Sequence, residues 1–425
     1  MAARRHQLVQ RREAVGHTQE SLAAAMNVDR TTVGRWESGR GTPQPWMRPK
    51  LAQALRVNAD QLDALLAPER PVIVESDHRA LDGETDSGLV ETVAAASADS
   101  ALFIQFASGS NVDAVLLEQL DADLRRLATE YVSKPVPQLI HEISTLRRSV
   151  FDLLRGRQRP QQAIQLYIAA GRLSGLATHV ALDMGHYAVA ATHARTAWLC
   201  AESADDNALR AWVCSARSLI AYWQRDYVRA ADVARAGIPY SDGSTIGARL
   251  LSLEARAAAA LGDSRAAQLA VHEATHARTD PVPHELPGVF TFPEAKQWTY
   301  AGTTFLALEA DRRHVRRAID ASTRAIALYQ ASAESDQSSG DLLAAHLDLA
   351  SAHLADGDAE AAEQDLRPVL QAAPERLTAS ITRRLGTLHQ QLASPAYARS
   401  RAVVGLRENV EEACSRPALA TTPEP

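Results

Sequence analysis

The sequence predicts an all-α protein in which a head of five short helices precedes a long body of paired helices. Only 5% of the 425 residues are aromatic, whereas the strong helix formers alanine and leucine are abundant. The 21 glycines and 19 prolines stand mostly between apolar runs, where they would end helices rather than interrupt them. Within those runs, apolar residues recur with the period of a helix. A chain of this length should form two or three domains.

The head is expected to span residues 1–66, with a start or stop signal beside most of its helices. Thr18 and Asp29 are suited to cap the second and third helices through their side-chain oxygens. Asn27 is a common substitute for glycine where a helix ends in the left-handed conformation, and Asn58 stands before the last helix. The expected helices are 4–14, 19–26, 30–37, 45–55 and 59–66.

The second and third helices carry the pattern of two helices that cross steeply at a tight turn. Apolar residues fill the positions that such a pair buries, and a small residue stands where a larger one would separate the helices. The expected core residues are Leu22, Ala23, Met26, Val28, Val33 and Trp36. Simple amphipathicity explains Leu22 and Met26 but not Ala23, nor Asn27 at the turn. The pattern therefore predicts a helix-turn-helix.

Charge is unevenly divided between head and body. Residues 1–70 hold eleven arginines and lysines against seven acidic residues, whereas the remaining residues hold 34 against 44. A basic head on an acidic body is expected when only one end of a chain meets a polyanion.

On these residues the head resembles the Xre/Cro-type phage-repressor family of DNA-binding domains. The likeness covers about residues 4–66, and it is carried by TQESLA (18–23), NVDRTTVGRWESG (27–39), Pro43 and KLAQALRV (50–57). In that family the second helix of the pair lies in the major groove, with its first residues on base edges.

Carried over by position, the resemblance implies which residues touch DNA. Arg30, Thr31 and Thr32 would read base edges, and Arg35 would lie one turn further along, at the groove wall. Gln19, in the first turn of its helix, would hold a phosphate. An arginine can bind guanine O6 and N7 together, and a threonine methyl can contact the methyl group of thymine. The alternative is a solvated helix face with no role in DNA binding.

Two further arginines and one glycine complete the expected interface. Arg40 and Arg48 are expected to add phosphate contacts that carry no sequence information. Gly34 weakens the recognition helix by about 1 kcal/mol relative to alanine. It either permits a close approach to DNA or has no functional meaning.

Residues 67–94 are expected to form an exposed linker. Residues 67–88 contain two prolines, two glycines and six acidic residues, a composition typical of linkers. The apolar stretch PVIV within them could pair as a short strand or pack on the body. At the other end of the chain, the tail 414–425 is expected to be disordered.

The body, residues 95–413, repeats a short turn motif between its apolar helical stripes. The motif reads GHYAVA (185–190), RDYVRA (225–230), GDSRAA (262–267) and GDAEAA (357–362), with a looser RHVRRA (313–318). It is typical of tetratricopeptide-like helix pairs, in which the last alanine permits close packing. The motifs lie further apart than the ~34 residues of that repeat, so we predict a degenerate α-solenoid of five or six helix pairs. A plain helical bundle is the alternative.

The whole chain resembles a group of actinobacterial regulators that join an Xre-type head to a degenerate tetratricopeptide body. The likeness is carried by HARTAWLCAE (193–202), SLIAYW (218–223), SLEARA (252–257) and GVFTFPEAKQ (288–297). More distantly, the chain is similar to peptide-responsive regulators of Gram-positive quorum sensing, in which a solenoid holds a small signal.

These resemblances imply a sequence-specific transcriptional regulator that binds double-stranded DNA as a homodimer. Its body is expected to mediate dimerisation, to sense a small-molecule or peptide effector, or both. An interaction scaffold whose head has lost DNA binding is the alternative reading.

HEATH (272–276) matches the zinc-protease pattern HExxH. His272 and His276 would bind zinc, and Glu273 would act as general base. The longer pattern with a third histidine is absent, because Thr279 and Val282 stand where its glycine and histidine would be. A zinc hydrolase is therefore a remote alternative, and we expect no enzyme, metal or cofactor.

Residues 280–298, DPVPHELPGVFTFPEAKQW, are expected to form a long loop that interrupts the solenoid. Loops of this length are uncommon inside compact domains and are often functional. The loop either caps the solenoid core or forms the wall of a ligand or partner pocket. In the second case Phe290, Phe292 and Trp298 supply apolar surface, and Lys296 meets an anionic group.

The sequence favours a cytoplasmic bacterial protein that has no membrane partner. The first residues lack the apolar region of a signal peptide, and no run of about 18 uncharged apolar residues occurs. Cys200, Cys214 and Cys414 fit no disulfide framework, so we expect reduced thiols.

Overall fold

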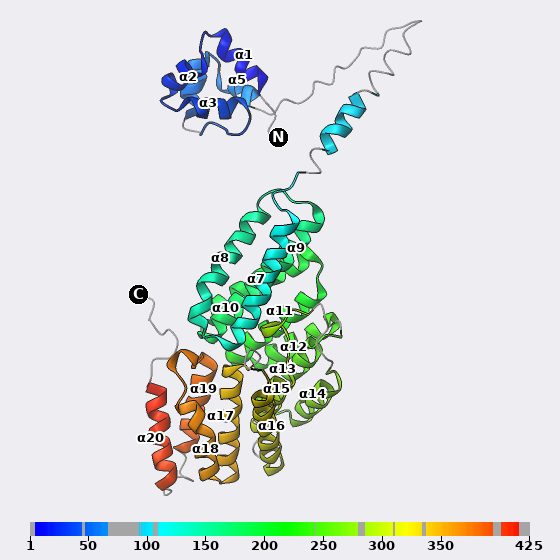
Figure 1. Cartoon of the computed structure of the whole chain (residues 1–425), viewed down its shortest axis with the longest axis vertical. Helices are drawn as coiled ribbons and strands as arrows, with labels where there is room; N and C mark the ends of the chain where they lie inside the picture. The colour runs from blue at the N-terminus through cyan, green and yellow to red at the C-terminus, as the bar shows by residue number, and fades with distance from the viewer. Residues whose placement is uncertain are drawn as a thin grey trace. The chain divides into compact units, whose positions relative to one another are not determined.

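The computed structural model describes the chain as two compact units, residues 1–108 and residues 109–425. The described residues are 5–44, 47–66, 93, 95–104, 109–241, 243–278, 285–308, 311–333, 337–393 and 401–415. Helices and the turns between them account for all of these ranges, and no strand occurs within them. The predicted all-α class is confirmed (Figure 1).

The first unit contains the five helices expected of the head. They are α1 (His6–Ala14), α2 (Gln19–Met26), α3 (Arg30–Glu37), α4 (Arg48–Leu55) and α5 (Ala59–Leu66). α1 starts two residues later than predicted and α4 three residues later; the other boundaries are as expected. The expected linker falls almost wholly on residues 67–92, which lie outside the described residues, as does the PVIV stretch.

Local side-chain chemistry sets the ends of the helix pair. The Thr18 hydroxyl accepts a hydrogen bond from the Ser21 backbone N–H at 3.1 Å, and the Ser21 hydroxyl accepts one from the Thr18 N–H at 2.8 Å. This reciprocal capping box starts α2. Asn27 ends it in the left-handed conformation, with φ of 57°. Asp29 Oδ1 then accepts the Thr31 N–H at 2.7 Å and starts α3.

The predicted core residues of the head are buried, apart from Val28, which is half-buried and packs against the others. Trp36 is the largest of them, and the small Ala23 is 4% exposed within the same core. Residues from α1, α4 and α5 complete the core: Leu8, Met47, Leu51, Leu55, Leu62 and Leu66. The five helices therefore share one apolar centre, and that centre fixes the crossing of α2 and α3.

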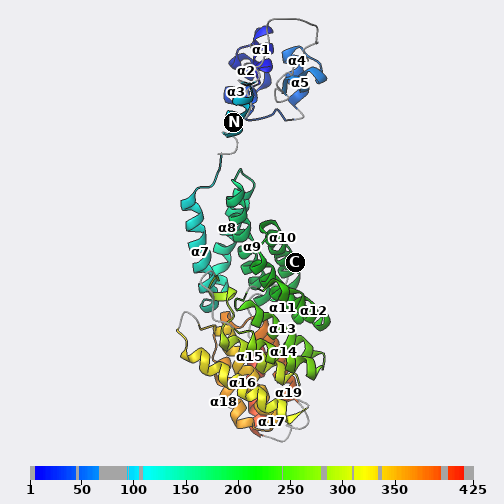
Figure 2. The ribbon, with the colours of Figure 1, turned by 90° about the vertical axis from the view of Figure 1, so that its right-hand side faces the viewer.

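The second unit is a succession of helices, most of which pack against the next helix in the chain (Figures 1 and 2). They are α7 (Ala114–Ser133), α8 (Val136–Leu154), α9 (Pro160–Asp183), α10 (Tyr187–Ala204), α11 (Asn207–Trp223), α12 (Tyr227–Gly237), α13 (Ile246–Ala260), α14 (Ser264–His276), α15 (Glu294–Leu306), α16 (Arg312–Ala331), α17 (Ser339–Asp356), α18 (Ala359–Leu370), α19 (Ala379–Leu392) and α20 (Arg401–Ser415). In addition, α13 packs against α15 and α17 against α19. This packing is consistent with a solenoid.

Four of the five recurrent turn motifs lie where the two helices of a pair meet. Each of these four begins at a residue with positive φ: Gly185, Arg225, Gly262 and Gly357. The fifth, RHVRRA, lies inside α16 instead. The last alanine of every motif has no exposed surface: Ala190, Ala230, Ala267, Ala318 and Ala362. A larger side chain at any of these positions would force the paired helices apart, because packed cores have no room for extra volume.

The expected loop at 280–298 is shorter than predicted, because α15 already begins at Glu294. Residues 279–284 lie outside the described residues, and residues 288–290 form a single 3₁₀ turn, η3 (Gly288–Phe290), against α7. Gly288 has φ of +68°, and a Cβ on it would lie 2.0 Å from the Ala128 carbonyl oxygen. Only glycine fits so close to the α7 backbone.

The far end of the body returns to its beginning. α17 contacts α7, and α19 contacts α9. The Arg383 guanidinium on α19 donates to the Trp223 carbonyl at the end of α11, 160 residues away in sequence. Its guanidinium also lies over the Tyr187 ring, 5.4 Å from the ring centre. These contacts bring helices from distant repeats around a common interior. α20 continues to Ser415, so the expected disordered tail, 414–425, begins inside a helix.

Candidate functional site

α3 presents two faces of opposite character. Val33 and Trp36 are 1% and 4% exposed and pack into the head core. Arg30, Thr31 and Arg35 are exposed on the other side, while Thr32 is half-buried. The helix is thus both part of the core and a carrier of exposed polar groups, which is the arrangement that a DNA-reading helix requires.

A negatively charged side chain, Asp29, caps the first turn of α3. The carboxylate of Asp29 caps the helix, and the hydrogen bond from the Thr31 backbone lowers the pKa of Asp29 below its usual value. A charged cap at this end also complements the positive end of the helix dipole. The cap fixes the backbone from which Arg30 and Thr31 project.

Arg30 is held by an exposed ion pair with α2. Its Nε lies 2.8 Å from Glu20 Oε1, and both side chains are more than 60% exposed. Exposed pairs of this kind are weak because solvent screens them and both long side chains lose freedom. The guanidinium can therefore exchange Glu20 for another acceptor at little cost.

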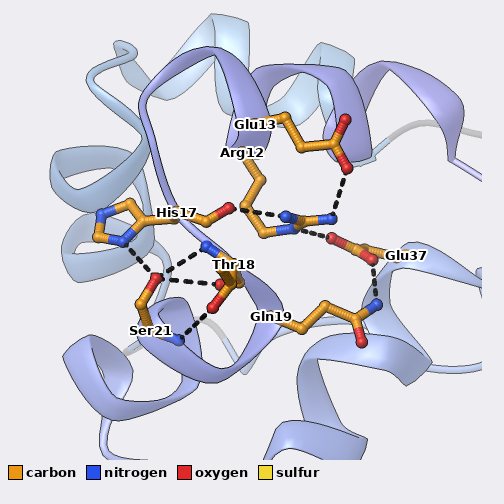
Figure 3. Close-up of polar contacts among 7 residues, drawn as sticks. All are labelled: Arg12, Glu13, His17, Thr18, Gln19, Ser21 and Glu37. Atoms are coloured by element: carbon orange, nitrogen blue, oxygen red, sulfur yellow. Dashed lines mark hydrogen bonds and ion pairs between the residues drawn. The ribbon is translucent and has the colours of Figure 1, made fainter.

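A buried polar network lies beneath α3, and sequence reasoning did not find it (Figure 3). Arg12 Nε donates to Glu37 Oε1 at 2.5 Å, and Gln19 Nε2 donates to Glu37 Oε2 at 2.6 Å. Arg12 also donates to the His17 carbonyl at 2.7 Å and lies 3.1 Å from Glu13. The network ties the start of α2 to the end of α3 and holds the Gln19 side chain. The predicted phosphate contact of Gln19 stays a prediction.

A second arginine anchors the beginning of the head on the end of α3. Arg5 is 8% exposed, and its Nη1 donates to the carbonyls of Trp36 and Gly41, each at 2.8 Å. Its backbone N–H donates to the Glu37 carbonyl at 2.8 Å. Arg5 thereby satisfies carbonyl groups that α3 leaves without intrahelical partners.

The outer arginines differ in their surroundings. Arg40 is exposed just beyond α3. Arg48 Nη1 lies 3.3 Å from Asp63 Oδ1, and its Nε is 3.5 Å from the Pro43 carbonyl oxygen. Around Gly34, a Cβ would meet nothing within 4 Å, so the protein itself does not require glycine at this position.

The HEATH histidines lie on the exposed side of α14. The His272 and His276 rings have centroids 4.3 Å apart in an edge-to-face arrangement, and Glu273 is exposed. Within the described ranges, no group of three or more histidine, cysteine, aspartate or glutamate side chains is gathered as a metal site would require.

The four residues expected on the 280–298 loop separate into different environments. Phe290 and Phe292 are 6% and 0% exposed and fill the core, the former 4.6 Å from the Trp212 ring. Trp298 donates from its indole nitrogen to Glu294 at 2.9 Å and lies beneath the Arg324 guanidinium. Lys296 lines the cavity of the body that is described below, where its Nζ is 2.9 Å from Asp341. The two phenylalanines are thus core residues and not a pocket wall.

The three cysteines are reduced thiols in this structure. Cys200, Cys214 and Cys414 are free, and burial raises the pKa of each. Among the helices of the described ranges, none combines the length and apolar character needed to cross a membrane.

Comparison with known proteins supports the assignment of the head. Residues 5–65 match a family model described as a helix-turn-helix domain, and the match covers α1 to α5. No curated protein matches the chain. The helix-turn-helix head indicates a DNA-binding regulator.

Proposed function

We propose that the protein is a sequence-specific transcriptional regulator with an Xre-type head that lays α3 in the major groove of double-stranded DNA. One observation carries the proposal: the buried face of α3 fixes the helix in the head, while Arg30, Thr31 and Arg35 project from its other face. In this geometry the N-terminal turn of the helix meets base edges.

Each side chain has a defined role in this proposal. Arg30 leaves its exposed partner Glu20 and binds guanine O6 and N7, while Thr31 and Thr32 contact the neighbouring bases. Arg35 follows the groove wall. Gln19, Arg40 and Arg48 bind phosphates and set the register of the head on the duplex.

The body, in turn, is proposed to be a tetratricopeptide-like solenoid that mediates dimerisation, senses an effector, or both. The buried alanines of its turn motifs and its paired helices support this reading. A single small head contacts few base pairs, so a homodimer would bind a pseudo-palindrome with half-sites about one helical turn, ~34 Å, apart. The proposed division is a head at 1–66, a linker at 67–94 and a body at 95–413.

The test is selection of DNA ligands from a random duplex library by the full-length protein, followed by salt titration of the selected site. We expect an enriched pseudo-palindrome and a steep loss of affinity with salt, because binding releases counterions from the phosphates. A library that shows no enrichment, together with affinity that is independent of salt, would favour the scaffold with a vestigial head.

A further inference from the structure

The interior of the body contains a cavity of about 620 Å³. Its walls include residues of α7, α9, α11, α13, α15, α16, α17 and α19, so distant repeats contribute to one space. Pockets of roughly 300–1,000 Å³ are typical of small-molecule sites. The volume suits a single small organic molecule.

One end of the cavity is acidic. The Tyr131 hydroxyl donates to Asp183 Oδ2, and Lys296 Nζ lies 2.9 Å from Asp341 Oδ2. These four residues belong to four different helices, α7, α9, α15 and α17. Lys296 forms its ion pair with Asp341 and acts on Asp183 only from a distance. Asp183 therefore has a tyrosine partner and no ion pair among the described residues.

The other end is basic. Arg384 on α19 pairs with Asp348 on α17, and Asp348 also accepts the Thr303 hydroxyl at 2.6 Å. Arg256 on α13 lines the same cavity. Two guanidinium groups thus share a single carboxylate at this end.

The separation of the two ends follows from helix geometry. Lys296 and Thr303 are seven residues apart on α15, and their partners Asp341 and Asp348 are seven residues apart on α17. Both helices therefore run in the same direction. Seven residues at 1.5 Å each separate the two ends by about 10 Å.

Arg256 is the group that points to a ligand. It is 2% exposed, and its guanidinium lies between the rings of Tyr222 and Tyr300, at 4.3 and 4.4 Å from their centres. Its Nε and Nη2 are buried and have no hydrogen-bond partner among the described residues. Buried guanidinium nitrogens that lack acceptors are costly, and a bound carboxylate can take two such N–H groups at once.

Other polar groups of the cavity wall reinforce this preference. Arg384 Nε has no hydrogen-bond partner among the described residues. At the acidic end, the buried His179 Nε2 also has no hydrogen-bond partner among them. A second buried guanidinium on α13, Arg249, is seven residues away from Arg256 and belongs to the opposite end, where it donates to the Val289 carbonyl at 3.0 Å. The unsatisfied nitrogens of Arg256 and Arg384 can only donate, so a molecule that offers acceptors is favoured at this end.

We propose that this cavity binds a small organic anion, a carboxylate carried on an apolar or aromatic body. The carboxylate lies at Arg256 and Arg384, the body lies along Leu219, Trp223 and Tyr300, and a hydrogen-bond donor at the opposite end meets Asp183. The proposal rests on the proposed regulatory function only in naming the ligand an effector.

The binding test uses two fluorescent probes that share one ring system and differ in an anionic group. 8-Anilinonaphthalene-1-sulfonate carries an anion on an aromatic body, and its sulfonate stands in for the carboxylate. N-phenyl-1-naphthylamine has the same ring system without the sulfonate. Both are titrated against the full-length protein, and DNA binding is measured separately on the same preparations, so failure of one proposal is distinguishable from failure of the other.

Charge-removing variants give the decisive comparison. Arg256→Gln and Arg384→Gln are expected to lower the affinity for the anionic probe at least tenfold and the affinity for the neutral probe less than twofold. Arg229→Gln, at an exposed arginine of α12, is the matched control and should change neither. Circular dichroism reports whether each variant folds, and Arg384→Gln alone decides the test if Arg256→Gln does not fold.

Three results would overturn the proposal. The first is the absence of saturable binding of the anionic probe to the wild-type protein. The second is an unchanged affinity for that probe in Arg384→Gln. The third is an equal loss of affinity for both probes in an Arg384→Gln variant that folds.

Discussion

Arg12 and Glu37, 25 residues apart in sequence, form an ion pair of 2.5 Å with only 8% and 5% of their side chains exposed. The pair joins α1 to the end of α3, and it also holds Gln19 through the second carboxylate oxygen. A buried charge that loses its partner is strongly destabilising, whereas removal of both charges often is not.

We therefore expect Glu37→Ala to destabilise the head by about 3 kcal/mol, because Arg12 would lose its buried partner. The double variant Arg12→Met with Glu37→Leu should recover most of that loss. Hydrogen exchange of the α2 and α3 amides in the full-length protein measures the stability of the head in the single and the double variant. Unchanged exchange in Glu37→Ala would show that the ion pair does not stabilise the head.

Arg30→Ala should lose discrimination at one base pair of the selected site, worth about 1–3 kcal/mol, while affinity for unrelated duplexes changes little. Gln19→Ala should instead weaken binding on all sequences alike, because a phosphate contact carries no base information. Competition binding with single-base variants of the site separates the two patterns. If both variants lose affinity uniformly, Arg30 does not read a base.

Gly34→Ala tests the meaning of the glycine in α3. A Cβ meets nothing within 4 Å there, so alanine should stabilise the helix by up to about 1 kcal/mol. If DNA lies close to this backbone, the variant should bind the selected site more weakly despite the gain in stability. Equal affinity in variant and wild type would mean that the glycine has no role in DNA binding.

Gly288→Ala should destabilise the body by more than about 2 kcal/mol, since the residue combines positive φ with a backbone contact that a Cβ would violate. Gly262→Ala is the matched control. Its φ is +81° but nothing lies within 4 Å of the added Cβ, so it should cost only about 1–2 kcal/mol. Thermal unfolding of the two variants measures the difference, and equal losses would contradict the close packing of η3 on α7.

Asp183 predicts a pH dependence of the body. Burial raises the pKa of Asp183 to about 6, whereas an unfolded aspartate titrates near ~3.9. Between these values the folded protein binds the extra proton, so stability falls as pH rises through about 6 and is greatest below about 4. Asp183→Asn removes this pH dependence, and its free energy of unfolding at pH 7.5 should be about 2–3 kcal/mol higher than that of the wild type. Melting temperatures between pH 4.5 and 8 test this, and a difference independent of pH would contradict it.

Sequence reasoning succeeded where a feature depends on neighbouring residues. Thr18, Asn27 and Asp29 set helix ends through contacts within three or four positions, and all three act as predicted. The alanines of the turn motifs were predictable for the same reason. These alanines belong to motifs of six consecutive residues, and four of the motifs mark turns between helices of the body.

Features that depend on distant residues were not predictable in the same way. Glu37 meets Arg12 only because α1 and α3 cross, and a single sequence does not specify that meeting. A charged residue one turn after Val33, on the same apolar face of α3, was the available signal. Lys296 was predicted to meet an anionic group, but its partner Asp341 lies on another helix pair and was not foreseen.

The return of α19 to α9 and α11 changes how the body must fold. A simple solenoid is stabilised by adjacent repeats, so it can form repeat by repeat along the chain. Here contacts such as Arg383 with Trp223 close a loop of 160 residues, and the entropy of that closure is lost before the contact forms. Non-local closure of this kind slows folding, and the cavity walls become complete only when the last helix pairs have been synthesised.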